Sequence, residues 1–233
     1  MKVKVNGINL YYSCVGEGQP LLLLHGNGES SSIFKELTEE LKPFFKLYLI
    51  DSRNHGQSDK TADYSYETMA NDVYEFIKKF NLDSVSVLGF SDGAIIGLLL
   101  ALRQPDLLKN LILLGGNLSP KDFKDDYRND LIQENEINPH PLYEMMLTQP
   151  NIKLSSLKKI TSPILFVAGE DDLFKDSLYD KLQQTLPNAH VEIMPNHDHE
   201  SYIVHSTALF PVLCKYFQLI NVEGKKELKF CVN

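Results

Sequence analysis

The sequence has few cysteines and no apolar segment long enough to cross a bilayer. Its three cysteines, Cys14, Cys214 and Cys231, are an odd number without metal-type spacing, which argues against a disulfide framework and favours a reducing compartment. The longest apolar run, Ala94 to Leu102, is too short for a membrane span. The N-terminus alternates charged and apolar residues and lacks the apolar core of a signal peptide. We therefore expect a soluble, cytoplasmic protein.

Basic charge is also scarce. Of 233 residues, 31 are acidic and 23 are Lys or Arg, so the formal net charge is −8. No run of Lys and Arg is long enough to follow a phosphate backbone, and we expect no nucleic-acid partner. The 43% of hydrophobic residues is ample for one well-packed core, so we expect residues 1–233 to form a single domain.

Short apolar runs alternate with helical patterns along most of the chain. We predict an N-terminal hairpin with its turn at Asn6–Gly7. Further strands are predicted at 20–26, 46–52, 84–90, 108–116, 163–172 and 190–195. Helices are predicted at 30–44, after Tyr64 with an apolar stripe from Met69 to Phe80, at 92–104 and from Leu209 to Ile220. This alternation predicts a mostly parallel sheet covered by helices on both faces. Residues 117 to about 157 interrupt it with two short helical patterns, which we interpret as a small cap insertion.

The segment "GFSDG", residues 89–93, lies where a buried strand is followed at once by an apolar helix. A sharp strand-to-helix turn strains the central residue and exposes its side chain at the carboxyl edge of the sheet. The flanking residues Gly89 and Gly93 are small enough for strand and helix to pass close together. Ser91 therefore occupies the position of a nucleophile, although a serine N-cap in a glycine-rich turn is the simpler alternative.

A serine nucleophile needs a base, and that base needs a group to orient it. The strand at 163–172 ends in the carboxylates of "GEDD", and the strand at 190–195 is followed by the histidines of "NHDH". Both strand ends belong at the edge of the sheet that carries Ser91. The order serine, acid, histidine is the order in which this architecture assembles a triad.

These motifs, with "HGNG" at 25–28 and "DSRNHGQSD" at 51–59, resemble the α/β-hydrolase fold family over essentially the whole chain. The resemblance implies a triad of Ser91, Asp172 and His199, preferred over Asp171 and His197 by the family spacing. It also implies an oxyanion hole formed by the backbone N–H groups of Asn27 and Asp92. Asn54 departs from the family pattern, in which glycine is common at this position.

Asp92 gives two open readings. A GxSDG turn is similar to that of a valacyclovir-hydrolase-like branch of the family, and a carboxylate there could favour substrates with a nearby cation. Alternatively, the side chain turns outward or caps the helix, as Asp does in a first turn. The cluster His197, Asp198, His199 and Glu200 superficially resembles a metal site, but it lacks an evident third protein ligand at suitable spacing. We expect neither metal nor cofactor, and we interpret His25 and His55 as loop-packing residues.

The predicted function is that of a serine hydrolase that cleaves a small or medium carboxylic ester through an acyl-enzyme. A thioesterase, an amidase or aminopeptidase, and a C–C bond hydrolase are alternatives on the same triad. A catalytically silent ligand receptor is the alternative from another class, because a fold alone does not fix a function. Apolar residues of the cap insertion are expected to line the pocket in part: Phe123, Tyr127, Leu131, Leu142, Tyr143, Met145 and Met146.

Overall fold

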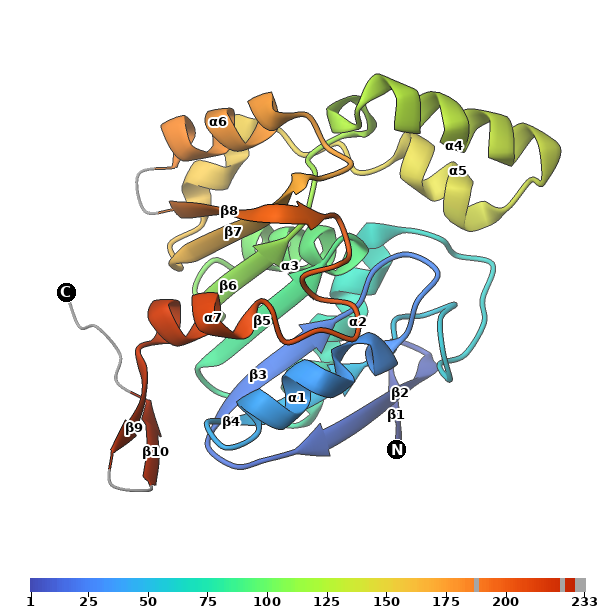
Figure 1. The fold of residues 1–233 in the computed structure, drawn as a ribbon. Coiled ribbons are helices and arrows are strands. Elements are labelled where there is room, and N and C mark those ends of the chain that lie inside the picture. Colours follow the sequence, from blue (N-terminus) through green and yellow to red (C-terminus); the bar gives the residue numbers. More distant parts are fainter. Residues whose placement is uncertain (187–188, 223–224, 229–233) are drawn as a thin grey trace.

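The computed structural model describes residues 1–186, 189–222 and 225–228 of the chain. Its centre is an 8-stranded sheet with the order β1-β2-β4-β3-β5-β6-β7-β8 (Figure 1). The strands are β1 Lys2–Val5, β2 Ile8–Val15, β3 Gln19–Leu24, β4 Phe45–Ile50, β5 Val85–Phe90, β6 Leu108–Leu114, β7 Ile164–Asp171 and β8 Ala189–Asp198. The first two strands and the β2–β4 pair are antiparallel, and every pair from β4 to β8 is parallel. The expected mostly parallel sheet is confirmed.

The central strands are apolar because both of their faces are buried. Every residue of β5 is buried, and the last four residues of β3 are too, because helices cover both faces of these central strands. At the edge of the sheet, Asn6 and Gly7 have φ values of 44° and 81°. Positive φ at both central residues matches the tight turn that joins two antiparallel strands, which confirms the predicted hairpin.

Helices cover the two faces of the sheet in separate groups. The α-helices are α1 Lys35–Leu41, α2 Tyr66–Lys79, α3 Asp92–Arg103, α4 Asp125–Ile137, α5 Pro141–Thr148, α6 Asp176–Thr185 and α7 Phe210–Phe217. One hydrophobic cluster joins the sheet to α2, α3 and α6, and the other joins it to α1 and α7. Figure 1 shows α1 and α7 in front of the sheet, and α4 and α5 stacked beyond one of its ends. Within the described residues, no helix has the length and apolarity needed to cross a membrane.

Some predicted boundaries are wrong. The last helix ends at Phe217 and not at Ile220, because Gln218 adopts a left-handed conformation (φ 51°, ψ 49°) that stops it. The chain continues as β9 Leu219–Val222 and β10 Lys225–Leu228, which pair with each other in a separate sheet. Helix α6 was not predicted. The predicted helix at 30–44 is a short 3₁₀ turn, Ser31–Phe34, followed by α1.

The segment 117–157 contains more elements than the two predicted helices. It begins with a 3₁₀ turn at Pro120–Asp122, continues with α4 and α5, and runs into a second 3₁₀ segment at Leu154–Lys159. The first turn is closed by a capping box between Ser119 and Asp122. The segment leaves the sheet after β6 and returns to it at β7, so it stands beyond the carboxyl ends of the central strands. Ligands of parallel α/β sheets bind at that edge.

Candidate active site

Ser91 lies in a strained turn between β5 and α3. Its φ of 52° and ψ of −112° fall where a residue other than glycine rarely sits. A Cβ on Gly89 would lie 2.1 Å from the carbonyl oxygen of Gly93, and a Cβ on Gly93 would lie 2.1 Å from that of Leu24. Strand and helix therefore approach too closely for any side chain at either position. The turn holds the Ser91 side chain at the sheet edge, as the sequence predicts.

Two hydrogen bonds join Ser91, His199 and Asp172. The Nε2 atom of His199 lies 3.1 Å from Ser91 Oγ, and its Nδ1 atom lies 2.8 Å from Asp172 Oδ1. Asp172 and His199 are 3% and 6% exposed, so water barely competes for the hydrogen bond between them. The structure thus brings the three residues together from strand ends that are far apart in the sequence.

Aromatic rings hold the imidazole of His199 in place. Phe90 lies 5.0 Å from it between ring centroids, and Phe174 packs edge-on at 5.6 Å. The neighbouring residues that the sequence left as competitors lie elsewhere. Asp171 is exposed at the end of β7, and His197 pairs with Ser201 Oγ at 3.0 Å. Contact with Ser91 therefore distinguishes His199 from His197.

The side chain of Asp92 is buried and does not cap α3. It is 4% exposed and therefore does not turn outward. Its Oδ1 accepts a hydrogen bond from the Tyr66 hydroxyl at 2.6 Å, and its Oδ2 accepts one from Asn27 Nδ2 at 2.9 Å. Burial raises the pKa of Asp92, and these two donors oppose that rise by stabilising the charged form. Each carboxylate oxygen of Asp92 therefore already accepts one hydrogen bond from within the protein.

Glu29 is a site residue that the sequence analysis missed. Its Oε2 accepts a 2.8 Å hydrogen bond from the backbone N–H of Gly26, and its side chain lines the cavity that contains Ser91. Burial raises the pKa of Glu29 to about 7, and the nearby carboxylate of Glu200 adds to the rise. The only signal in the sequence was its position directly after "HGNG", the loop in which Asn27 is expected to contribute to the oxyanion hole.

A cavity of about 70 Å³ surrounds Ser91 and His199. Its apolar wall combines Phe90 and Leu173 from the sheet edge with Phe123, Tyr127 and Met146 from the segment 117–157. Leu142 and Tyr143 instead line a larger adjacent cleft of about 450 Å³, which meets the cavity at Asn27. Ligand pockets usually measure roughly 300–1,000 Å³. The space next to Ser91 is therefore small.

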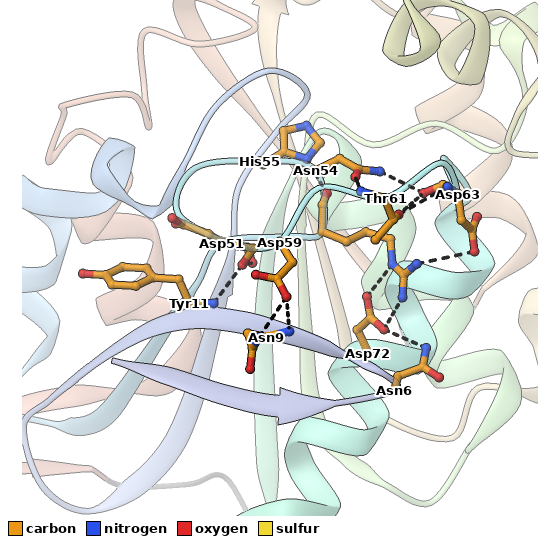
Figure 2. A network of polar contacts seen from close by, with 12 residues as sticks. Asn6, Asn9, Tyr11, Asp51, Asn54, His55, Asp59, Thr61, Asp63 and Asp72 are labelled. Atoms are coloured by element: carbon orange, nitrogen blue, oxygen red, sulfur yellow. Dashed lines mark hydrogen bonds and ion pairs between the residues drawn. The ribbon is translucent and has the colours of Figure 1, made fainter.

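The loop that follows β4 is fixed by a polar network (Figure 2). Arg53 donates to both carboxylate oxygens of Asp72, at 2.6 and 2.7 Å, and both side chains are buried. Asn54 has a φ of 66°, and its side chain accepts from the N–H of Thr61 and donates to the carbonyl of Asp63. Asn tolerates this left-handed conformation better than most residues, which explains how it replaces the family's glycine.

His25 and His55 pack beneath these loops. His25 Nε2 accepts from the N–H of Ser52 at 3.0 Å, so its Nδ1–H donates to the Gly26 carbonyl at 2.7 Å. Burial lowers the pKa of His25 to about 4, and the adjacent His55 contributes to that shift. His55 Nδ1 lies 2.9 Å from the Arg53 carbonyl. Both rings tie loops together, and in the described part of the chain no His, Cys, Asp and Glu side chains gather in a metal-binding group of three.

Comparison with known proteins supports the resemblance to α/β hydrolases. A sequence profile described as the α/β hydrolase fold matches residues 19–133. The chain is 34% identical over 98 residues to ethanol acetyltransferase 1 of Hanseniaspora uvarum, covering 41% of this chain and 29% of that protein. It is 32% identical over 133 residues to an abhydrolase domain-containing protein of Schizosaccharomyces pombe, covering 55% of this chain and 49% of that one. The chain thus spans less than half the length of these two relatives.

Solved structures agree with the family on the fold. Est816, described as an N-acyl homoserine lactone degrading enzyme, superposes with a TM-score of 0.75 at 23% identity, covering 93% of this chain and all of that one. A marine microorganism esterase superposes with a TM-score of 0.66 at 26% identity, covering 88% of this chain and 95% of that one. The chain has the α/β-hydrolase fold, and residues 19–133 match the sequence profile of that family.

Proposed function

We propose that the protein is a serine hydrolase that cleaves small carboxylic esters through an acyl-enzyme. One observation carries the proposal: Ser91 Oγ, in a strained turn, lies 3.1 Å from an imidazole whose other nitrogen lies 2.8 Å from a buried carboxylate. This is the arrangement that activates a serine hydroxyl. On this proposal the chain acts as one α/β-hydrolase domain, with residues 117–157 as its cap.

Ser91 is the nucleophile in the proposed reaction. Its Oγ forms a bond to the ester carbonyl carbon, the carbonyl π pair moves to oxygen, and His199 Nε2 takes the hydroxyl proton. The tetrahedral adduct then breaks its bond to the alkoxide oxygen, which receives that proton and leaves as an alcohol. Water repeats the sequence on the acyl-enzyme, and the acid is released with Ser91 regenerated. Asp172 remains ionised throughout and stabilises the imidazolium.

The developing oxyanion needs hydrogen-bond donors. We assign this role to the backbone N–H groups of Asn27 and Asp92, which belong to the two loops that meet at Ser91. Asn27 lines the same cavity as Ser91 and His199, and Asp92 begins α3, whose first N–H groups have no partner within the helix. One such donor typically contributes about 3–4 kcal/mol of transition-state stabilisation.

The size of the cavity supports a small acyl group. A space of about 70 Å³ lined by Phe90, Phe123 and Met146 suits a short aliphatic chain better than a long one. The adjacent larger cleft, which meets the cavity at Asn27, is our candidate for the alcohol portion of the ester. The lining carboxyl groups of Glu29 and Glu200 disfavour an anionic acyl group.

Acyl transfer to an alcohol is a second candidate. Ethanol acetyltransferase 1 of Hanseniaspora uvarum shares 34% identity over 98 residues with this chain, and a short-chain alcohol could replace water in attacking the same acyl-enzyme. The thioesterase, amidase and C–C hydrolase alternatives use the same residues on other leaving groups. A silent receptor would not need the hydrogen-bonded arrangement of Ser91, His199 and Asp172.

Release of p-nitrophenol from p-nitrophenyl acetate tests the main proposal. Wild type should turn over and take up a fluorophosphonate label at Ser91, and Ser91→Ala should lose both. Addition of ethanol distinguishes transfer from hydrolysis, because transfer yields ethyl acetate at the expense of acetate. A wild type that shows neither turnover nor labelling would refute the enzyme proposal and favour a receptor.

A further inference from the structure

Asp92 links three segments that are distant in the sequence. It is the first residue of α3, directly after Ser91, and its carboxylate is bound by Tyr66 from α2 and by Asn27 from the loop after β3. The two partners lie 26 and 65 positions away along the chain. The contacts are therefore a product of the fold and not of the local turn.

The two ends of the Asn27–Asp92 contact are also the two residues whose backbone N–H groups we assign to the oxyanion hole. We propose that Asp92 is a positioning residue: its carboxylate holds the Asn27 side chain and so fixes the spacing between the two oxyanion donors. This inference rests on the proposed function. It assigns the Asp92 carboxylate to the geometry of the hole and not to recognition of a substrate cation.

The burial of this carboxylate needs such an explanation. A buried charge is costly unless donors compensate it, and burial does raise the pKa of Asp92. A plain helix start would be served equally by a small neutral residue. Hydrogen bonds to a charged acceptor are roughly twice as strong as neutral ones. A carboxylate therefore binds Asn27 more firmly than a neutral side chain would, and a small displacement of a donor is costly in an oxyanion hole.

Tyr66 is itself held firmly on the other side. Its ring is 1% exposed, and burial together with Asp92 raises its hydroxyl pKa well above 10, so it remains a neutral donor. Its backbone N–H donates to Gln149 Oε1 at 3.2 Å, and Gln149 Nε2 donates to the Tyr64 carbonyl at 3.1 Å. Gln149 follows α5, so the end of the cap helices supports the same hydrogen-bonded chain. Asn27, half-buried on its loop, is the less constrained partner that Asp92 would hold.

A donor–acceptor exchange tests the role of the contact. Asn27→Asp places two carboxylates face to face and should lower kcat on p-nitrophenyl acetate by about 10²-fold, the loss typical of one oxyanion donor. KM should change much less than kcat, because the loss is confined to the transition state. In Asp92→Asn, the amide oxygen can still accept from Asn27 while its N–H₂ donates to Tyr66, so the loss should be smaller. The double variant restores the contact with reversed roles and should regain at least tenfold over Asn27→Asp.

A second readout follows the oxyanion directly. An aliphatic trifluoromethyl ketone adds to Ser91 as a tetrahedral oxyanion, so its inhibition constant should rise in Asn27→Asp and recover in the double variant. Asn27→Ala removes the contact without adding charge, and its inhibition constant should also rise. Asn138→Asp is the matched control, since Asn138 Nδ2 also donates to a carboxylate, Glu134, at 2.9 Å, but on the exposed end of α4. It should change neither kcat nor the inhibition constant.

The outcomes separate the two proposals. If wild type is active, Ser91→Ala is inactive, and Asn27→Asp keeps the wild-type kcat and inhibition constant, the positioning role is refuted and the hydrolase stands. A double variant no better than Asn27→Asp, with both folded by circular dichroism, also refutes the positioning role. A wild type without turnover or labelling overturns the hydrolase proposal and this inference together.

Discussion

The imidazole of His199 lies against Gly115, in space that no other residue at position 115 would leave free. Gly115 follows β6 with a φ of 51°, and a Cβ built on it would lie 2.6 Å from His199 Cε1. We expect Gly115→Ala to displace the ring from Ser91 and lower kcat/KM on p-nitrophenyl acetate by about 10²-fold, the scale of a 1 Å misplacement. Steady-state kinetics of the folded variant measures this.

Gly7→Ala is the control for this prediction. Gly7 has a φ of 81°, so alanine is strained there as well, but nothing lies within 4 Å of its missing Cβ. That variant should lose stability through its backbone and keep its kcat/KM. Wild-type kinetics in Gly115→Ala would show that His199 has room to move without loss of function.

The pKa of Glu29 makes stability depend on pH. Its folded pKa of about 7 is above the 4.5 of a free carboxyl, so between these values the folded state binds more protons than the unfolded state. The stabilising contribution is complete below pH 4.5 and is lost as the pH rises through 7. Glu29→Gln keeps the acceptor for Gly26 without the charge. The free energy of unfolding of Glu29→Gln, taken relative to that of wild type, should therefore increase from pH 5 to pH 8.

Urea unfolding of both proteins across this range measures the difference, and groups common to both cancel. Glu136→Gln, on the exposed face of α4, is the control and should run parallel to wild type. A Glu29→Gln difference that stays flat from pH 5 to pH 8 would mean that Glu29 ionises normally.

If the protein is the proposed esterase, Met146 should limit the length of the acyl chain that it accepts. It lines the cavity next to Ser91 and is 9% exposed. Met146→Ala should raise the ratio of kcat/KM for p-nitrophenyl butyrate over acetate by about tenfold or more, since each methylene accommodated in a pocket is worth about 1–3 kcal/mol. An acyl-chain series on wild type and variant measures the ratio.

The adjacent Met145 provides the control. It is 1% exposed in the same helix and belongs to the same hydrophobic cluster as Met146, but it is not among the residues that line the cavity at Ser91. Met145→Ala should lose about 2–5 kcal/mol of stability through the void it leaves and keep the wild-type ratio. If the two variants change the ratio equally, Met146 has no special place in the acyl pocket.

The parts of the site carried by local pattern could be predicted from the sequence. Ser91 was identified from two glycines that leave room for a strand-to-helix turn, and Asp172 and His199 each follow a predicted strand. The interpretation of Asp92 as an outward or helix-capping side chain was wrong, and its contacts with Tyr66 and Asn27 could not be predicted, because the two residues reach it only through the fold. Glu29 was missed for a related reason, since the residues that line the cavity with it come from distant segments.

The fold likewise contains elements that could be predicted from the sequence and elements that could not. The buried strand β3 was predicted from a continuous apolar run, and β5 was predicted from an alternating β-branched run. Helix α6 was missed although Leu178, Tyr179 and Leu182 form a buried stripe, because its N-cap is Lys175 and makes no side-chain cap. The last helix was extended to Ile220 because apolar spacing continues past the left-handed Gln218, which gives no signal of its own.

The buried ion pair of Arg53 and Asp72 should contribute much to stability, whereas the more exposed contact of Arg53 with Asp63 should contribute little. Asp72 accepts from Arg53 Nε at 2.6 Å and Nη2 at 2.7 Å, whereas Asp63, with a 47% exposed side chain, lies 3.4 Å from Nη1. Asp72→Asn leaves a buried guanidinium without a full counter-charge, and we expect it to cost about 3–5 kcal/mol. Asp63→Asn should cost less than about 1 kcal/mol. Urea unfolding at neutral pH compares them, and equal losses would contradict the assignment of the buried pair as the anchor of the loop after β4.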